Sequence, residues 1–222
     1  MLGLCQENIL FVLGGSIGMI YELRTYDIKP RTVDQFGENT KLKLEGRLKF
    51  SDLGGFWYTE IGPLNQVVHI WPYDDANHRA ETRYKAVSEG DWPPDNDEIV
   101  LNMNSEIMLP APFMRPLEPQ NIGPVYEMRV YTYKPGEIPK VLDAWGGAIE
   151  KREEYSPLVG CWYSDVGDLN KFIHMWAYDS LESRTNIRTE TIKQGIWPPK
   201  GGIAPLKQEN KILLPFDFSP LQ

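Results

Sequence analysis

The stretch Tyr21-Glu-Leu-Arg-Thr-Tyr26 decides the fold, because it returns as Tyr126-Glu-Met-Arg-Val-Tyr131, 105 positions later. The same offset relates the rest of the two segments without a gap, and His69-x-Trp71-x-Tyr73-Asp74 returns as His174-x-Trp176-x-Tyr178-Asp179. A period of roughly 100 residues exceeds that of a solenoid repeat, about 20–50 residues. It is long enough for a small domain. The sequence therefore predicts two copies of one domain in a single chain.

The limits of the repeat divide the chain into four parts. We expect a non-repeat N-terminal extension at 1–18, a first repeat at 19–117, a linker at 118–124 and a second repeat at 125–222. The apolar run in the extension is too short to span a membrane. The extension also lacks the basic start of a signal peptide and the arginine-rich composition of a transit peptide. We expect it to be poorly ordered and give it no role.

Each repeat shows the same order of predicted elements. Alternating residues and aromatic-rich runs predict strands, and proline, glycine and aspartate mark the ends of the helices. In the first repeat the strands are expected at 20–28, 55–61, 65–73 and within 98–109, with helices at 31–49 and 75–89. The order β-α-β-β-α-β is the ferredoxin-like arrangement, an antiparallel sheet with both helices on one face. The predicted class is α+β, two tandem ferredoxin-like repeats packed sheet to sheet.

Alternation along the strands divides their residues between two faces. We expect the apolar set that includes Leu23 and Ile70 to lie beneath the helices. We expect the polar set that includes Glu22, Arg24 and His69 to face the other repeat, because a ferredoxin-like sheet leaves one face to be covered. The sequence thus predicts a polar interior shared by the two repeats.

The predicted interior supplies the candidate ligand-binding residues. In one interpretation the arginines grip an anion, the tyrosines donate hydrogen bonds and the tryptophans stack. In the other, each Glu–Arg pair is a structural ladder that fixes strand register. The candidates are Glu22, Arg24, Tyr26, Trp57, Trp71, Glu127, Arg129, Tyr131, Trp162 and Trp176. Replacing Arg24 with methionine is expected to cost roughly 3 kcal/mol if its partner stays buried and unpaired.

His69 and His174 are the catalytic candidates, because only these duplicated groups titrate near neutrality. A histidine on a strand is also a common satisfied core residue, so the structural interpretation stays open. We predict no metal site, since HxH, HExxH and cysteine-pair motifs are missing, and we expect no cofactor. Arg79 and Arg83, repeated as Arg184 and Arg188, are interpreted as a solvated helix face.

Composition limits the partners. A net charge of −8 argues against nucleic acid, whose phosphates require a basic surface. Two cysteines, Cys5 and Cys161, cannot build a disulfide framework, which fits a reducing compartment. We therefore expect a cytoplasmic protein with no nucleic-acid or membrane partner. A homo-oligomer or a protein partner remains compatible with the sequence.

The segments Ile20-Tyr-Glu-Leu-Arg-Thr-Tyr26, Gly55-Phe-Trp-Tyr58 and Asn65-Gln-Val-Val-His-Ile-Trp71 resemble the NIPSNAP family, and the resemblance covers both repeats. It implies a dimeric α/β barrel, here formed within one chain, and a bacterial cytosolic member. Most members have no assigned reaction. Some eukaryotic members are mitochondrial and act in vesicle traffic or mitophagy, a role that we do not carry over because no transit peptide is apparent.

Two functions follow as hypotheses. The first is a small-molecule-binding or interaction module. The alternative is a barrel enzyme, a cofactor-independent monooxygenase or isomerase acting on a small anionic or aromatic substrate, with His69 or His174 as base. Because Phe172 is larger than its counterpart Val67, we expect the ligand pocket in the first half, near Arg24 and His69.

Overall fold

The computed structural model describes residues 19–222, so the expectations for the extension 1–18 lie outside the described residues. The first repeat contains β1 (Ile20–Ile28), α1 (Val33–Leu48), β2 (Gly55–Ile61), β3 (Gln66–Tyr73), α2 (Ala76–Ser88) and β4 (Val100–Pro110). The second contains β5 (Val125–Thr132), α3 (Ile138–Gly146), α4 (Ile149–Glu153), β6 (Leu158–Val166), β7 (Lys171–Tyr178), α5 (Leu181–Lys193) and β8 (Lys207–Pro215). The predicted order of elements is confirmed.

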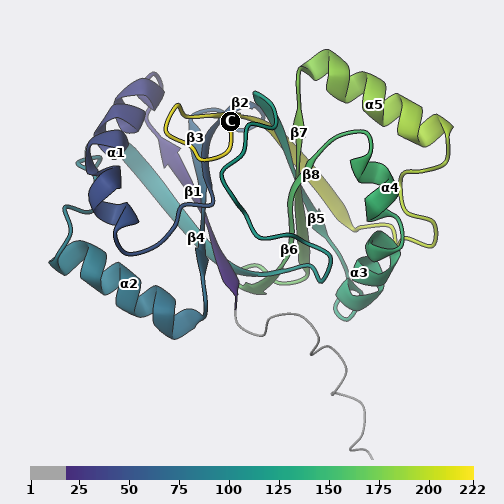
Figure 1. The fold of residues 1–222 in the computed structure, drawn as a ribbon, viewed down its shortest axis with the longest axis horizontal. Helices are drawn as coiled ribbons and strands as arrows, with labels where there is room; N and C mark the ends of the chain where they lie inside the picture. The colour runs from purple at the N-terminus through teal and green to yellow at the C-terminus, as the bar shows by residue number, and fades with distance from the viewer. Residues whose placement is uncertain (1–18) are drawn as a thin grey trace, which may run out of the picture.

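The strands close into one barrel, in the order β1-β3-β2-β8-β5-β7-β6-β4. Within each repeat the strands pair antiparallel, and the last strand also pairs with the other repeat, β4 with β6 and β8 with β2. Figure 1 shows α1 and α2 outside the barrel on one side, and α3, α4 and α5 outside it on the other. The predicted barrel of two ferredoxin-like units is therefore confirmed, with main-chain hydrogen bonds joining its halves.

Both helices of the first repeat lie within one or two residues of their expected bounds. The carboxylate of Asp75 accepts hydrogen bonds from the backbone N–H groups of Asn77 and His78, which caps α2. The helix after β5 differs from α1, because it ends at Gly146 and resumes as α4 at Ile149. No helix within residues 19–222 is long and apolar enough to cross a bilayer.

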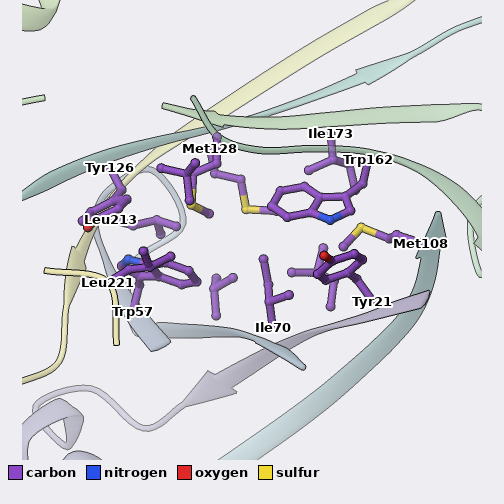
Figure 2. Close-up of a cluster of buried hydrophobic side chains, with 14 of the residues drawn as sticks. Tyr21, Trp57, Ile70, Met108, Tyr126, Met128, Trp162, Ile173, Leu213 and Leu221 are labelled. Atoms are coloured by element: carbon purple, nitrogen blue, oxygen red, sulfur yellow. The ribbon is translucent and has the colours of Figure 1, made fainter. Parts of the chain in front are cut away.

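The barrel interior is an apolar core built by both repeats (Figure 2). The ring of Tyr21 packs edge-on to Trp162 at 5.8 Å, and Trp57 packs against Tyr126 at 5.5 Å, so each repeat contributes one tyrosine and one tryptophan to these contacts. The core comprises Tyr21, Leu23, Trp57, Val68, Ile70, Met108, Tyr126, Met128, Val159, Trp162, Ile173, Met175, Ala177, Leu213 and Leu221. The two halves thus share one core.

The predicted assignment of the two sheet faces is wrong. Leu23 and Ile70 lie in the barrel core, whereas Glu22, Arg24 and His69 lie on the outer face, beneath the helices. The physical reason is that joining two sheets buries a large common surface, which apolar side chains fill at no electrostatic cost. The charged face is stabilised instead by cations on the covering helices.

The duplicated Gly-x-Trp motif has a packing cause. A Cβ added to Gly55 would lie 2.0 Å from the ring of Trp57, and one added to Gly160 would lie 2.1 Å from the ring of Trp162. Each indole therefore folds back over the glycine two residues earlier on the same strand face, where a larger side chain has no room.

Replacing Gly55 with alanine is therefore expected to lower the free energy of unfolding by about 2 kcal/mol, because the displaced indole sits in the barrel core. Gly147→Ala is the control, since its added Cβ would meet its nearest atom at 3.8 Å in an ordinary helical backbone conformation. Urea denaturation of both variants provides the measurement. Equal stability of the two variants would mean that the indole of Trp57 can move aside freely.

Candidate functional site

A buried carboxylate organises the outer face of the first repeat. Glu22 is fully buried, and its Oε1 accepts hydrogen bonds from Arg24 at 2.7 Å, Arg79 at 2.7 Å and Ser105 at 2.6 Å. The guanidinium of Arg83 lies 3.7 Å from its other oxygen. Three cations from β1 and α2 thus converge on one anion.

The second repeat builds the same cluster. Glu127 is fully buried and accepts hydrogen bonds from Arg129 at 2.7 Å and from Arg184. Arg188 lies 3.6 Å from it, and the amide of Asn210 donates at 3.3 Å from the position that matches Ser105. Both repeats therefore keep the same carboxylate–arginine cluster, although Ser105 in the first is replaced by Asn210 in the second. This indicates that the cluster stabilises the fold of each repeat.

The electrostatics of Glu22 follow from this geometry. Burial by itself would raise the pKa of its carboxyl group. The hydrogen bonds from Arg79 and Ser105, with the charges of Arg24 and Arg83, outweigh burial and lower that pKa to about 2. The pKa of Glu127 is lowered in the same way, against the effect of burial. Both carboxylates are therefore ionised at neutral pH.

The imidazole of His69 is neutral, and its two nitrogens have different roles. Its Nδ1 accepts a hydrogen bond from the indole Nε1 of Trp71 at 2.6 Å. Burial, followed by the charge of Arg24, holds the pKa of the imidazole well below its usual value. A neutral imidazole with an accepting Nδ1 carries its proton on Nε2, and this buried Nε2 has no hydrogen-bond partner among the described residues. His174 and Trp176 repeat the arrangement at 2.9 Å.

Arg47 of α1 was not among the predicted site residues. Its guanidinium lies 4.3 Å above the ring of Trp71 and donates hydrogen bonds to Tyr73 at 2.9 Å and Ser51 at 2.7 Å. Arg152 occupies the same place over Trp176 at 4.2 Å. The 105-residue spacing, which duplicates this arginine, is the sequence signal that could have revealed it.

A cavity of about 270 Å³ opens between the helices and the sheet of the first repeat. Its walls combine aromatic rings with three guanidinium groups and one rim carboxylate, and they reach His69. The lining residues are Arg24, Tyr26, Phe36, Thr40, Arg47, Phe56, His69, Trp71, Arg83, Val87, Trp92, Pro93, Pro94, Asn96, Asp97, Val100 and Met103.

The second repeat has a hollow of about 300 Å³ that is lined differently. It is bordered by Tyr131, Trp145 and Trp197 but does not reach His174. The ring of Trp145 packs on the imidazole of His174 at 4.6 Å and separates it from the hollow. Of these two cavities, the one that meets the duplicated histidine is thus in the first repeat, on the helix side of the sheet.

The structure brings most of the predicted site residues together. In the first repeat Glu22, Arg24, Tyr26, His69 and Trp71 form one contiguous group, since Arg24 also donates to the Tyr26 hydroxyl at 2.6 Å. Their counterparts in the second repeat, Glu127, Arg129, Tyr131, His174 and Trp176, do the same.

The other two predicted residues, Trp57 and Trp162, lie in the barrel core, on the opposite side of the sheet from the site. They point inward because they share the face of Leu23 and Ile70. Arg79 and Arg83, interpreted as solvated, bind the buried Glu22 instead. Both arginines and the carboxylate recur in the second repeat, and this joint recurrence could have indicated that they interact. Within residues 19–222, no three His, Cys, Asp or Glu side chains are grouped to hold a metal ion.

The closed barrel with one helix-covered site per repeat defines a tandem dimeric α/β-barrel protein. The NIPSNAP family model matches residues 21–115 and 126–220. The human protein NipSnap homolog 3B is 33% identical over 217 residues, which cover 92% of this chain and 87% of the human protein. A NipSnap homolog from Dictyostelium discoideum is 30% identical over 182 residues, or 80% and 78% of the two chains. The chain belongs to the NIPSNAP family.

More distant solved structures share the whole barrel. A protein from Fusobacterium nucleatum superposes with a TM-score of 0.65 at 16% identity, over 90% of this chain and 93% of that one. An anthrone oxidase-like protein superposes with a TM-score of 0.55 at 12% identity, over 89% and 91% of the two chains. At these identities the likeness shows the fold alone.

Proposed function

We propose that the chain binds a small organic anion in the cavity of the first repeat. One observation carries the proposal: the cavity of the first repeat is lined by the cationic side chains of Arg24 and Arg83 and by His69, together with several aromatic rings. A mostly apolar pocket with a few convergent polar groups is the usual form of a small-molecule site. A volume of about 270 Å³ suits a small ligand.

The charges around the cavity favour an anion. Glu22 offsets one of the three guanidinium groups that surround it, which leaves two positive charges in excess. Arg83 has the longest contact to Glu22, 3.7 Å, and its side chain is 41% exposed. It can therefore turn toward a ligand while Arg24 and Arg79 keep the carboxylate paired. A carboxylate bound by such a group gains a charge-assisted hydrogen bond.

The imidazole geometry favours binding over general-base catalysis. A base needs a free nitrogen lone pair within reach of the proton that it removes. The lone pair of His69 Nδ1 is engaged by Trp71, and Nε2 carries the proton. The imidazole of His69 therefore has no free lone pair with which to act as a base. This supports a binding protein in preference to the alternative of a cofactor-independent monooxygenase or isomerase.

Replacing Arg83 with glutamine is expected to weaken anion binding about tenfold, the loss of one hydrogen bond to a charged group. Arg188→Gln is the matched control, because Arg188 occupies the same helix position but borders neither the cavity nor the hollow of the second repeat. The probes are benzoate, octanoate and indole-3-acetate, measured by ligand-observed NMR. If none of them binds, or if both variants weaken binding equally, the site is not the cavity of the first repeat.

Native mass spectrometry of freshly purified protein complements this test. If a natural ligand is retained, we expect an adduct of small mass on the unchanged chain and on Arg188→Gln, and a weaker adduct on Arg83→Gln. An adduct of undiminished intensity on Arg83→Gln would place the bound molecule elsewhere.

A further inference from the structure

The two repeats hold nearly identical aromatic frames around their histidines. The rings of Trp71 and Trp92 lie 6.1 Å apart at 73°, and those of Trp176 and Trp197 lie 5.9 Å apart at 75°. The tyrosine–histidine pairs agree as closely, at 4.9 and 5.0 Å and at 88° in both. One repeat can therefore serve as a guide to the other.

The residues around these frames differ at several positions, among them Phe36 (Val141 in the second repeat), and one difference lies at position 40 of the first helix. Thr40 of α1 lines the cavity of the first repeat, and its hydroxyl donates to the Phe36 carbonyl at 2.7 Å, within its own helix. The 105-residue offset places Trp145 of α3 at the same position in the second repeat. Its indole is 5% exposed and therefore almost fully enclosed. The second repeat carries an aromatic side chain where the first repeat has a short one beside a cavity.

The surroundings of Trp145 show what this position accepts. Its ring packs against Trp197 at 4.5 Å and 90°, against His174 at 4.6 Å and 57°, and against Phe172 at 4.7 Å and 70°. These are the separations of favourable aromatic pairs. A planar bicyclic ring is thus a suitable occupant of the space between the first helix, the tryptophan of the Trp-Pro-Pro segment and the histidine.

A second exchange sets the orientation in the first repeat. Phe56 stacks on one face of His69 at 4.5 Å and 17°, whereas its counterpart in the second repeat is the smaller Cys161. A ligand therefore cannot cover that face of the imidazole. Trp92, Thr40 and His69 all line the cavity, and they remain as the residues that a ligand can contact there.

We propose that the cavity of the first repeat takes a planar aromatic carboxylate of about the size of an indole, and that Trp145 marks the corresponding position in the second repeat. The aromatic ring of the ligand packs against Trp92 beside Thr40, and its carboxylate meets Arg83. This inference rests on the proposed anion-binding function and specifies the shape of the ligand.

The test compares two anions on the full chain by isothermal titration calorimetry. Indole-3-acetate represents the planar aromatic class, and octanoate is an aliphatic carboxylate without a ring. We expect indole-3-acetate to bind at one site and about tenfold more tightly than octanoate, the factor that one or two favourable aromatic contacts supply. This comparison uses the unchanged protein and does not depend on the folding of any variant.

Two reciprocal substitutions test the role of the helix position. Thr40→Trp introduces the ring of the second repeat and is expected to abolish indole-3-acetate binding. Trp145→Thr removes that ring and is expected to raise the number of indole-3-acetate molecules per chain from one to two, because Arg129, Arg188 and His174 then border a second opening. Near-UV circular dichroism verifies that each variant keeps its tertiary structure.

The outcomes separate this inference from the function on which it rests. Octanoate binding as tightly as indole-3-acetate, with both weakened about tenfold in Arg83→Gln, would overturn the aromatic preference and leave the anion site intact. A folded Trp145→Thr variant that still binds one indole-3-acetate would overturn the correspondence between the two positions. If neither anion binds the unchanged chain, the proposed function itself fails.

Discussion

Replacing Glu22 with glutamine is expected to lower the free energy of unfolding by about 3–5 kcal/mol, the usual cost of removing one partner from a buried ion cluster. The carboxylate is fully buried, and Arg24, Arg79 and Arg83 all depend on it for their negative partner. Without that charge the three guanidinium groups repel one another between the sheet and α2. Urea denaturation at neutral pH provides the measurement.

Two controls accompany this measurement. Glu127→Gln removes the equivalent carboxylate of the second repeat and should cause a loss of the same size. Glu98→Gln removes a fully exposed carboxylate, 3.9 Å from Lys29, and should leave stability unchanged within error. A loss below about 1 kcal/mol for Glu22→Gln, the range of a solvated pair, would show that water reaches the cluster and replaces the missing charge.

Arg24→Met should be milder than the sequence alone indicates. The figure of roughly 3 kcal/mol assumed that Glu22 would be left buried without a partner. In the structure Glu22 still accepts hydrogen bonds from Arg79 and Ser105 after Arg24 is removed. Because one carboxylate pairs with three arginines, replacing the carboxylate should lower the free energy of unfolding more than replacing any one of the arginines.

The stability of the protein is expected to fall in acid, with Glu22 alone accounting for about 3 kcal/mol. Its pKa is about 2 in the folded chain against 4.5 as the ordinary value. The stabilisation is therefore fully present above pH 4.5 and is lost as the pH falls from 4.5 toward 2, because the unfolded chain binds the proton first. The lowered pKa of Glu127 adds a loss of the same sign.

The two buried histidines extend this loss to a higher pH. Burial and neighbouring arginines hold the pKa of His69 and of His174 well below 6.5. As the pH falls through 6.5, these histidines become protonated in the unfolded chain but stay neutral in the folded chain. Unfolding therefore becomes more favourable. The decline in stability should therefore begin near pH 6.5 and continue through the carboxylate range.

Urea denaturation at a series of pH values tests the acid response. The free energy of unfolding of the unchanged chain should decrease steadily below pH 6.5. Glu22→Gln starts lower at neutral pH but should show a shallower decrease between pH 4.5 and 2, since one titrating group is missing. Parallel curves in that interval would mean that the carboxyl group of Glu22 titrates alike in the folded and unfolded chains.

The repeated sequence was sufficient to predict the elements and their arrangement. A residue kept at the same offset in both copies marked each strand, and the order of strands and helices allowed few alternatives. The group formed by Glu22, Arg24, Tyr26, His69 and Trp71 also followed from strand alternation, because residues two apart share a face.

The direction of each face could not be predicted from alternation, because both faces of these strands are buried. In an ordinary amphipathic strand one face is buried and the other is solvent-exposed, so the apolar face can be assigned to the core. In these strands one face is buried in the barrel and the other is buried beneath the helices. The helices that cover the sheet carry arginines on their inner side, so the face beneath them is polar. Only the joint duplication of Arg79, Arg83 and Glu22 indicated that helix and strand charges meet.

The sequence predicted more room beside His69 than beside His174, but within the barrel interior; the two cavities lie on the helix side instead, and their volumes are similar, about 270 and 300 Å³. The exchange of Val67 for Phe172 suggested less room beside His174, and the hollow of the second repeat indeed does not reach that residue. Trp145 of α3, distant in sequence from the strand residues under comparison, also packs on His174. Helix positions that point at a sheet are difficult to identify until the helix has been placed on it.

The covalent connection between the two halves has a consequence for how such a protein can evolve. In a barrel assembled from two separate identical chains, every substitution is made in both halves, so a side chain that closes one site closes the other. Here β4 and β8 join the halves as they would join two subunits, yet position 40 and position 145 are inherited independently. One half can therefore fill the space beside its histidine with a tryptophan while the other half keeps a cavity there.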